Sequence, residues 1–84
     1  MDSLELAIDA YLKLEKQVPE NADIQNDLAG LLCIAERYED AELACQRALK
    51  LDPSHSDASL NLGHALVGQN RADEAEKMLR QVIR

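Results

Sequence analysis

The chain has 84 residues, which is enough for one small domain at most. Hydrophobic residues make up 46% of it and aromatic residues only 2%, and because alanine and leucine supply most of the apolar set, the composition argues against an all-β fold. Acidic residues outnumber basic ones by 16 to 9. The resulting net charge of −7 argues against nucleic acid and anionic membrane surfaces as partners, because both bind clustered basic residues.

No segment of the sequence has the pattern of a membrane span or a signal peptide. The longest uninterrupted apolar run is Leu31–Ala35, whereas a membrane-spanning helix needs about 20 apolar residues. The acidic start at Met1 and Asp2 does not lead into a signal peptide. Two cysteines, Cys33 and Cys45, are too few for a disulfide framework, so we expect a reduced, cytoplasmic setting.

Apolar residues recur at helical spacing along the whole chain. The clearest case lies in the middle, where steps of three and four residues place Tyr38, Ala41, Cys45 and Ala48 on one face of a helix. In chain order, the pattern predicts five helices, at Ser3–Gln17, Ala22–Ala35, Tyr38–Leu51, His55–Val67 and Ala72–Ile83.

Breaks between the predicted helices carry recognisable signals. The first helix ends before Pro19 and the third before Pro53, because proline disfavours helical geometry in the residue that precedes it. Asn21 and Ser54 follow these prolines and are the expected N-caps of the second and fourth helices. Gly68-Gln69-Asn70 forms a turn before the fifth helix. All connections are short, so neighbouring helices are expected to form antiparallel hairpins.

The chain repeats itself after 34 residues. This shift aligns Ala7 with Ala41 and Ala75, and Pro19 with Pro53. Further matched pairs are also apolar or small: Leu28 and Leu62, Ala29 and Gly63, and Leu32 and Leu66. A structural repeat keeps such packing positions while its polar positions vary.

This helix–turn–helix period resembles the tetratricopeptide repeat. One complete unit carries the motif as Leu28-Ala29, Leu32, Tyr38, Ala41, Cys45, Ala48 and Pro53. The resemblance covers residues 1–84 as a single domain of about two and a half repeats: a half repeat at 1–21 (its second helix only), a full repeat at 22–55 and a nearly full repeat at 56–84. It implies an all-α fold, an α-α superhelix in which antiparallel helix hairpins form a right-handed solenoid.

The chain departs from the family pattern at two pairs of positions. Gln25 and Ser59 stand where the family usually has a large aromatic residue, and Cys45 and Leu79 stand where phenylalanine is common. We therefore expect a less tightly filled interior and modest stability.

The sequence offers no constellation of catalytic or metal-binding residues. His55 and His64 do not form zinc-ligand spacing with each other or with a cysteine. The serines lie at helix starts, where N-capping is their ordinary role, and the acidic pairs Glu39-Asp40 and Asp73-Glu74 fall in first helical turns, where they oppose the helix dipole. We predict no enzymatic activity, no metal and no cofactor.

In this family, the first helix of each unit lines the concave face of the superhelix, and extended peptides bind there. The resemblance therefore implies that partner-binding residues lie on these helices, away from the packed stripe. The candidates are Asp23, Asn26, Asp27, Gly30, Asp57, Leu60, Asn61 and His64. Two interpretations fit them, a ligand groove and an ordinary solvated face.

The charge of these candidates indicates which kind of partner such a groove would bind. The three aspartates favour a basic or polar peptide and would repel the acidic tail that the family's carboxylate clamp holds. Asn61 is similar to a residue of the asparagine ladder in the O-linked N-acetylglucosamine transferase repeats, although Asp27 takes the equivalent place one unit earlier.

The two end helices have apolar residues with no expected partner. They are Leu4, Leu6, Ile8, Leu12, Met78, Val82 and Ile83. We expect either a window from a longer array, which is the favoured interpretation, or units that associate end to end as a homo-oligomer.

The sequence thus predicts a non-catalytic protein–protein interaction module. The alternatives are a substrate-recruiting or regulatory repeat segment of a larger enzyme of the glycosyl- or sulfotransferase type, and a self-associating structural unit.

We expect Ala41→Leu to lower the free energy of unfolding by about 1–3 kcal/mol, because a larger side chain overpacks a close helix contact. Urea denaturation measures this change. An unchanged denaturation midpoint would show that Ala41 is not at a close contact.

Overall fold

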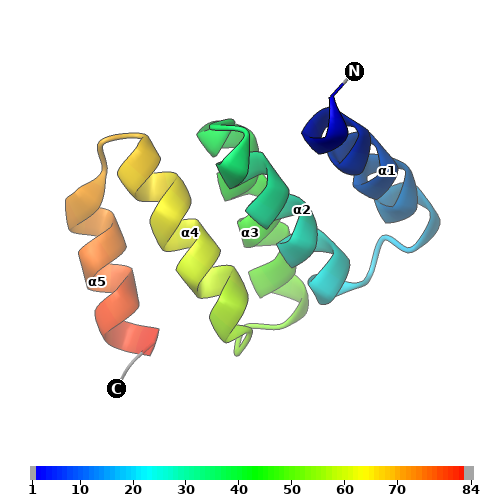
Figure 1. The fold of residues 1–84 in the computed structure, drawn as a ribbon. Helices are drawn as coiled ribbons and strands as arrows, with labels where there is room; N and C mark the ends of the chain where they lie inside the picture. The colour runs from blue at the N-terminus through cyan, green and yellow to red at the C-terminus, as the bar shows by residue number, and fades with distance from the viewer. Residues whose placement is uncertain (1, 83–84) are drawn as a thin grey trace.

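A computed structural model describes residues 2–82 of the chain. Within this range the backbone forms five helices and no strand, which confirms the all-α prediction (Figure 1). The helices are α1 (Ser3–Gln17), α2 (Ala22–Ile34), α3 (Tyr38–Leu51), α4 (Ser56–Gly68) and α5 (Ala72–Val82). Ile83, the predicted end of the last helix, lies outside the described residues.

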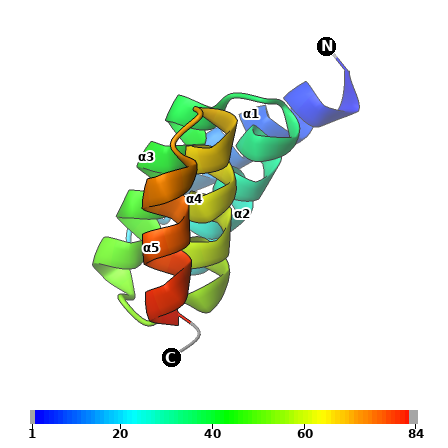
Figure 2. The same ribbon diagram turned by 90° about the vertical axis from the view of Figure 1, so that its left-hand side faces the viewer.

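The helices stack side by side as successive hairpins. Each helix packs against the next one along the chain, and α2 also contacts α4. In the view of Figure 2, α2 and α4 lie on one side and α3 and α5 on the other, so the first and second helices of the repeats form two layers. This superhelical stacking makes a slab with extents of 36 × 25 × 15 Å.

Side-chain caps set the beginnings of the first two helices. The Oδ1 of Asp2 accepts a hydrogen bond from the Glu5 amide at 2.8 Å, so Asp2 and not a serine caps α1. The Oδ1 of Asn21 accepts one from the Ile24 amide at 3.0 Å, which confirms Asn21 as the cap of α2. Each cap satisfies a backbone donor that has no partner inside the helix.

The prediction that Ser54 caps α4 is wrong. Helix α4 begins at Ser56, one residue later than predicted, so His55 is the capping residue. Its Nδ1 accepts a hydrogen bond from the Ala58 amide at 3.1 Å. Ser54 instead donates from its amide and its hydroxyl to Oδ1 of Asp52, at 3.1 and 2.8 Å, and so closes the turn before the helix.

The turns after α2 and α4 have the same backbone geometry. Glu36 and Asn70, which are equivalent in the repeat, have φ values of 59° and 62°. The next amide in each turn donates back into the helix: Arg37 to the Leu32 carbonyl and Arg71 to the Leu66 carbonyl, both at 2.8 Å. This six-residue closure is the Schellman motif. The repeat therefore extends to the backbone conformation of its turns.

Small side chains fill the contacts between the helices. The core residues with no exposed surface are Leu28, Ala29, Ala41, Ala44, Cys45, Ala48, Ala58 and Ala65. Most are alanines, so the helix backbones lie close together and little apolar volume separates the layers. The complete burial of Ala41 agrees with its place in a close helix contact.

The two positions that lack the family's aromatic residue are buried in different surroundings. Gln25 is 2% exposed, and its Oε1 accepts a hydrogen bond from Nε of Arg47 at 3.0 Å. Ser59 is 8% exposed and lies beside an open hollow of about 500 Å³, which Leu49, Leu62 and Met78 also line. A polar network therefore occupies this position in one unit, whereas a hollow remains in the other.

One of the apolar residues predicted to be uncovered on the end helices, Ile8, is buried. Ile8 is 3% exposed, because α1 turns this side chain toward α2 and into the core cluster. Leu6 and Leu12 are 56% and 37% exposed, whereas Leu4 and Met78 are half-buried. The side chains of Val82 and Ile83 lie outside the described part of the chain.

No helix within residues 2–82 combines the length and the apolar content that a bilayer crossing requires.

We expect Gly68→Ala to lower the free energy of unfolding by about 1–3 kcal/mol, because the added Cβ would overlap the ring of Tyr38. Gly30→Ala is the matched control, since a Cβ there meets only the Asn61 amide nitrogen at 3.7 Å. Alanine at this helical position should leave stability unchanged or raise it by up to about 1 kcal/mol. Thermal denaturation of both variants tests the pair, and equal effects would contradict the close contact at Tyr38.

Candidate functional site

The predicted binding residues form one surface, which we call the α2–α4 face: Asp23, Asn26, Asp27, Gly30, Asp57, Leu60, Asn61 and His64. Steps of three and four residues place each group along one side of its helix. The aspartates, Leu60 and His64 are exposed, whereas Asn26, Gly30 and Asn61 are half-buried. The structure therefore keeps the whole predicted set within reach of solvent.

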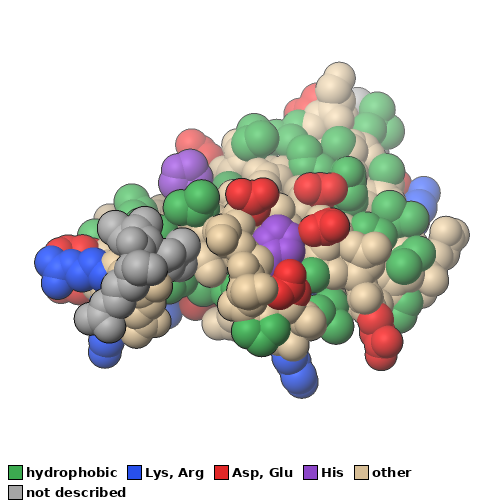
Figure 3. Space-filling model, turned by 90° about the horizontal axis from the view of Figure 1, so that it is seen from below, with side chains coloured by type: hydrophobic (Ala, Val, Ile, Leu, Met, Phe, Trp, Pro, Cys, Tyr) green, Lys and Arg blue, Asp and Glu red, His purple; other side chains and the backbone are tan. Residues whose placement is uncertain are grey.

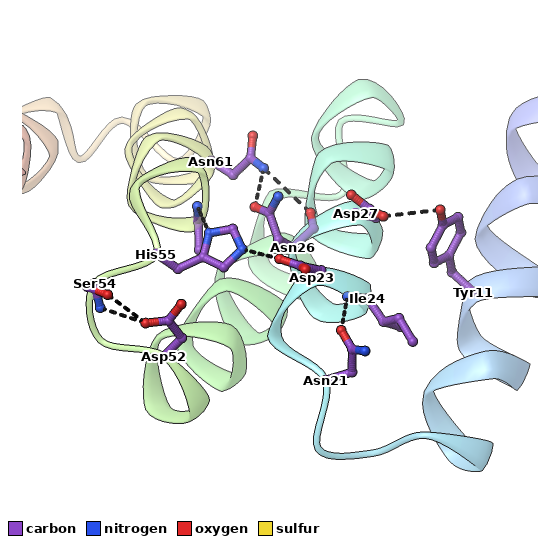
Figure 4. A network of polar contacts seen from close by, with 11 residues as sticks. Tyr11, Asn21, Asp23, Ile24, Asn26, Asp27, Asp52, Ser54, His55 and Asn61 are labelled. Atoms are coloured by element: carbon purple, nitrogen blue, oxygen red, sulfur yellow. Dashed lines mark hydrogen bonds and ion pairs between the residues drawn. The ribbon is translucent and has the colours of Figure 1, made fainter.

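A pair of asparagines joins the two helices at the centre of this face. Nδ2 of Asn61 donates to Oδ1 of Asn26 at 2.8 Å and to the Asn26 carbonyl at 3.5 Å (Figure 4). These contacts orient the Asn61 amide. They leave Oδ1 of Asn61 and Nδ2 of Asn26 without a hydrogen bond to another described residue. One acceptor and one donor are therefore available to a ligand.

A second polar bridge lies at the beginning of α4. Nε2 of His55 lies 2.8 Å from Oδ1 of Asp23 on α2 (Figure 4). Because Nδ1 of the same ring accepts from the Ala58 amide, the neutral imidazole carries its proton on Nε2 and donates it to Asp23. His55 therefore caps one helix and links it to the other. The sequence pattern missed this role because it placed the cap one residue too early.

Tyr11 brings α1 to the edge of the face. Its hydroxyl donates to Oδ2 of Asp27 at 3.2 Å (Figure 4). The negative charge of Asp27 raises the pKa of Tyr11, and the hydrogen bond and slight desolvation act in the same direction. The sequence gives no local sign of this contact, because Tyr11 aligns with the apolar repeat positions Cys45 and Leu79 and its polar partner lies on the next helix.

Two hollows open on this face, and Asn61 lines both of them. The first, about 380 Å³, is lined by Tyr11, Asn26, Asp27, Gly30, Leu31, Ile34 and Asn61. The second, about 480 Å³, is lined by Gly30, Cys33, Ile34, Tyr38, Asn61, His64, Val67 and Gly68. They share three residues and are therefore adjacent.

Both hollows contain apolar residues that the sequence interpretation did not include. Ile34 is 70% exposed and Val67 is 53% exposed. Their signal was present in the sequence, since both are apolar residues near the ends of first helices and off the packed stripe.

The α2–α4 face carries negative charge without a permanent cation. Neither helix contains Lys or Arg, while Asp23, Asp27 and Asp57 contribute a formal charge of −3. Figure 3 views the molecule from below, the side on which the turn between α3 and α4 lies in Figure 1, and shows acidic side chains gathered around a histidine on that side. An acidic surface of this kind attracts cationic ligands from solution.

The thiols and the titratable clusters do not suggest reactive chemistry. Burial, as the main cause, raises the pKa of Cys45 to about 12 and also raises that of Cys33, so both thiols stay protonated at neutral pH. Among residues 2–82, no group of three or more His, Cys, Asp and Glu side chains is placed to hold a metal ion.

Comparisons with known proteins agree with the geometry. Two family models, each described as tetratricopeptide repeat, match residues 2–56 and 32–84. The chain is also similar to human protein O-mannosyl-transferase TMTC1, with 35% identity over 73 residues. This match covers 87% of the chain and 8% of the human protein. The chain therefore spans a small part of that relative's length.

We expect Asp27→Asn to lower the pKa of Tyr11 toward its ordinary value, because a neutral amide accepts the hydrogen bond without repelling the phenolate. Titration followed by the ultraviolet absorbance of tyrosinate measures the change, with Tyr38→Phe removing the other tyrosine. Asp73→Asn, which neutralises an exposed carboxylate on α5, should leave the titration unchanged. Identical curves for both variants would contradict the contact between Tyr11 and Asp27.

Proposed function

Because this chain belongs to the tetratricopeptide repeat family, we propose that it is a non-catalytic interaction module that binds an extended, basic or polar segment of a partner protein on its α2–α4 face. One observation carries the proposal: the available amide groups of Asn26 and Asn61 lie on a face that is acidic and free of Lys and Arg.

The asparagine pair suits a peptide backbone. An extended segment presents N–H and C=O groups along its edge, and each needs a partner when it leaves water. Oδ1 of Asn61 can accept from such an N–H, and Nδ2 of Asn26 can donate to such a C=O. Contacts of this kind bind a segment without selecting its side chains, so specificity has to come from the surroundings of the pair.

Charge supplies part of that specificity. The carboxylates of Asp23, Asp27 and Asp57 attract basic side chains and repel acidic ones. Since these groups are exposed, salt screens them, and the association rate should fall as ionic strength rises.

A second candidate function is a substrate-recruiting or regulatory repeat segment of a larger enzyme. The similarity to a protein O-mannosyl-transferase favours it, because repeats like these form part of a chain that is named for a transferase activity. Under this proposal the α2–α4 face would hold an acceptor protein for a catalytic domain elsewhere in the same chain. A catalytic domain in the parent sequence would support this function over a free-standing module.

Photo-crosslinking tests the face directly. We expect a benzoylphenylalanine in place of Leu60, which is 51% exposed on α4, to crosslink a partner in lysate of the source cells. The same group in place of Leu43, which is 52% exposed on α3, is the matched control. Equal crosslinking of the same partner from both positions would place binding elsewhere.

A charge variant tests whether the aspartates contribute to this crosslink. We expect the triple variant Asp23→Ala, Asp27→Ala and Asp57→Ala to lose the Leu60 crosslink. The control triple Glu20→Ala, Glu39→Ala and Asp73→Ala removes the same charge from exposed residues away from the face, two of them at equivalent positions in first helical turns. Equal crosslinking by both triples would remove the aspartates from the proposed site.

A further inference from the structure

We propose that the partner segment carries a bulky aliphatic side chain flanked by basic residues, and that the aliphatic group sits in the hollow framed by Ile34 and Val67. This inference rests on the proposed function and specifies the chemistry of the ligand. It commits to a segment of another protein as the occupant.

The walls of this hollow favour an apolar group. Ile34 and Val67, from the ends of α2 and α4, expose 70% and 53% of their surface, although both are large apolar residues. They line the hollow together with Cys33 and Tyr38, which are half-buried. A side chain placed among these residues would remove apolar surface from water on both partners, which is favourable by about 25 cal/mol per Å².

The absence of a side chain at Gly30, which lines this hollow, lets a ligand lie close to the backbone of α2. Gly30 has no side chain, and a Cβ built there would find only the Asn61 amide within 4 Å. Asn61 also lines this hollow, and its Oδ1 has no hydrogen bond to another described residue. A partner backbone can therefore lie against Gly30 and Asn61 while its side chain enters between Ile34 and Val67.

We expect basic residues beside the aliphatic residue of the partner segment, because the adjacent hollow is lined by an acidic side chain. That hollow shares Gly30, Ile34 and Asn61 with the first and is also lined by Asp27 and Tyr11. In an extended chain, side chains two positions apart point to the same side, so they can enter neighbouring hollows. A lysine or arginine two positions from the aliphatic residue would reach Asp27 without meeting a competing cation on α2 or α4.

The test uses four capped synthetic peptides and ¹⁵N-labelled protein. The parent peptide is Gly-Ser-Lys-Ser-Leu-Ser-Lys-Ser-Gly, in which lysines stand two positions to either side of leucine. In the second peptide serine replaces the leucine, and in the third glutamate replaces both lysines. The fourth peptide carries all three replacements. Titrations are followed by the amide chemical shifts of Gly30, Ile34, Asn61 and Val67.

We expect the parent peptide to shift these amides saturably. The leucine-to-serine peptide should bind at least about fivefold more weakly, because it loses the buried aliphatic group. The glutamate peptides should bind more weakly still at low salt, because the aspartates repel them. Equal binding of all four peptides, or tighter binding of a glutamate peptide, would overturn the inference.

Matched protein variants assign each contribution. Val67→Ser should weaken the parent peptide about fivefold, whereas Leu43→Ser, at an equally exposed apolar position on α3, should have no effect. Asp27→Asn keeps the hydrogen bond from Tyr11 and should weaken the parent peptide about two- to fivefold, while Asp73→Asn should not. No difference within either pair would overturn the corresponding part of the inference.

Failure of this inference is distinct from failure of the proposed function. If the Leu60 crosslink forms but the parent peptide does not bind, the face is an interaction site with a different ligand chemistry. If the α2–α4 amides shift with protein concentration alone, the occupant is a second copy of the chain and the inference is overturned.

Discussion

Close approach of the helix backbones governs how this whole fold packs. Ala41, Ala44, Cys45 and Ala48 on α3 are fully buried, because this helix lies between α2 and α4 and contacts both. Small side chains allow these contacts, and larger ones would separate the helices. This spacing also brings α2 and α4 into direct contact, so residues far apart in the chain come to share one face.

The polar contacts on that face combine structural and binding roles. The hydrogen bonds from Asn61 to Asn26 and from His55 to Asp23 join the two helices. The partly buried bond between the asparagines contributes modestly to stability, about 0.5–1.5 kcal/mol. The same contacts orient the amide and carboxylate groups that remain available to a ligand. Binding at this face would therefore use groups that folding has already positioned, which lowers the entropic cost of association.

The two repeat units differ at one packing position, which Gln25 occupies in the first unit and Ser59 in the second. In the first, the buried carboxamide of Gln25 pairs with the guanidinium of Arg47, whose side chain is partly exposed. In the second, the equivalent residues are Ser59 and Gln81, and a hollow of about 500 Å³ lies between them. Gln25 and Arg47 come from the two helices of one unit, and Ser59 and Gln81 from the two helices of the next, so this position is formed within each unit. Loss of the family's aromatic residue therefore has local consequences that differ between units.

Local signals in the sequence are enough to predict the period, the five helices and the side of α2 and α4 that faces solvent, because helical spacing, proline breaks and small residues each act over a few residues. Packing of the helices sets three further features: the contact of His55 with Asp23, the burial of Ile8 and the hydrogen bond from Tyr11 to Asp27. It also created the hollow between Ile34 and Val67. These features depend on contacts between residues separated by a helix or more, which no local pattern encodes.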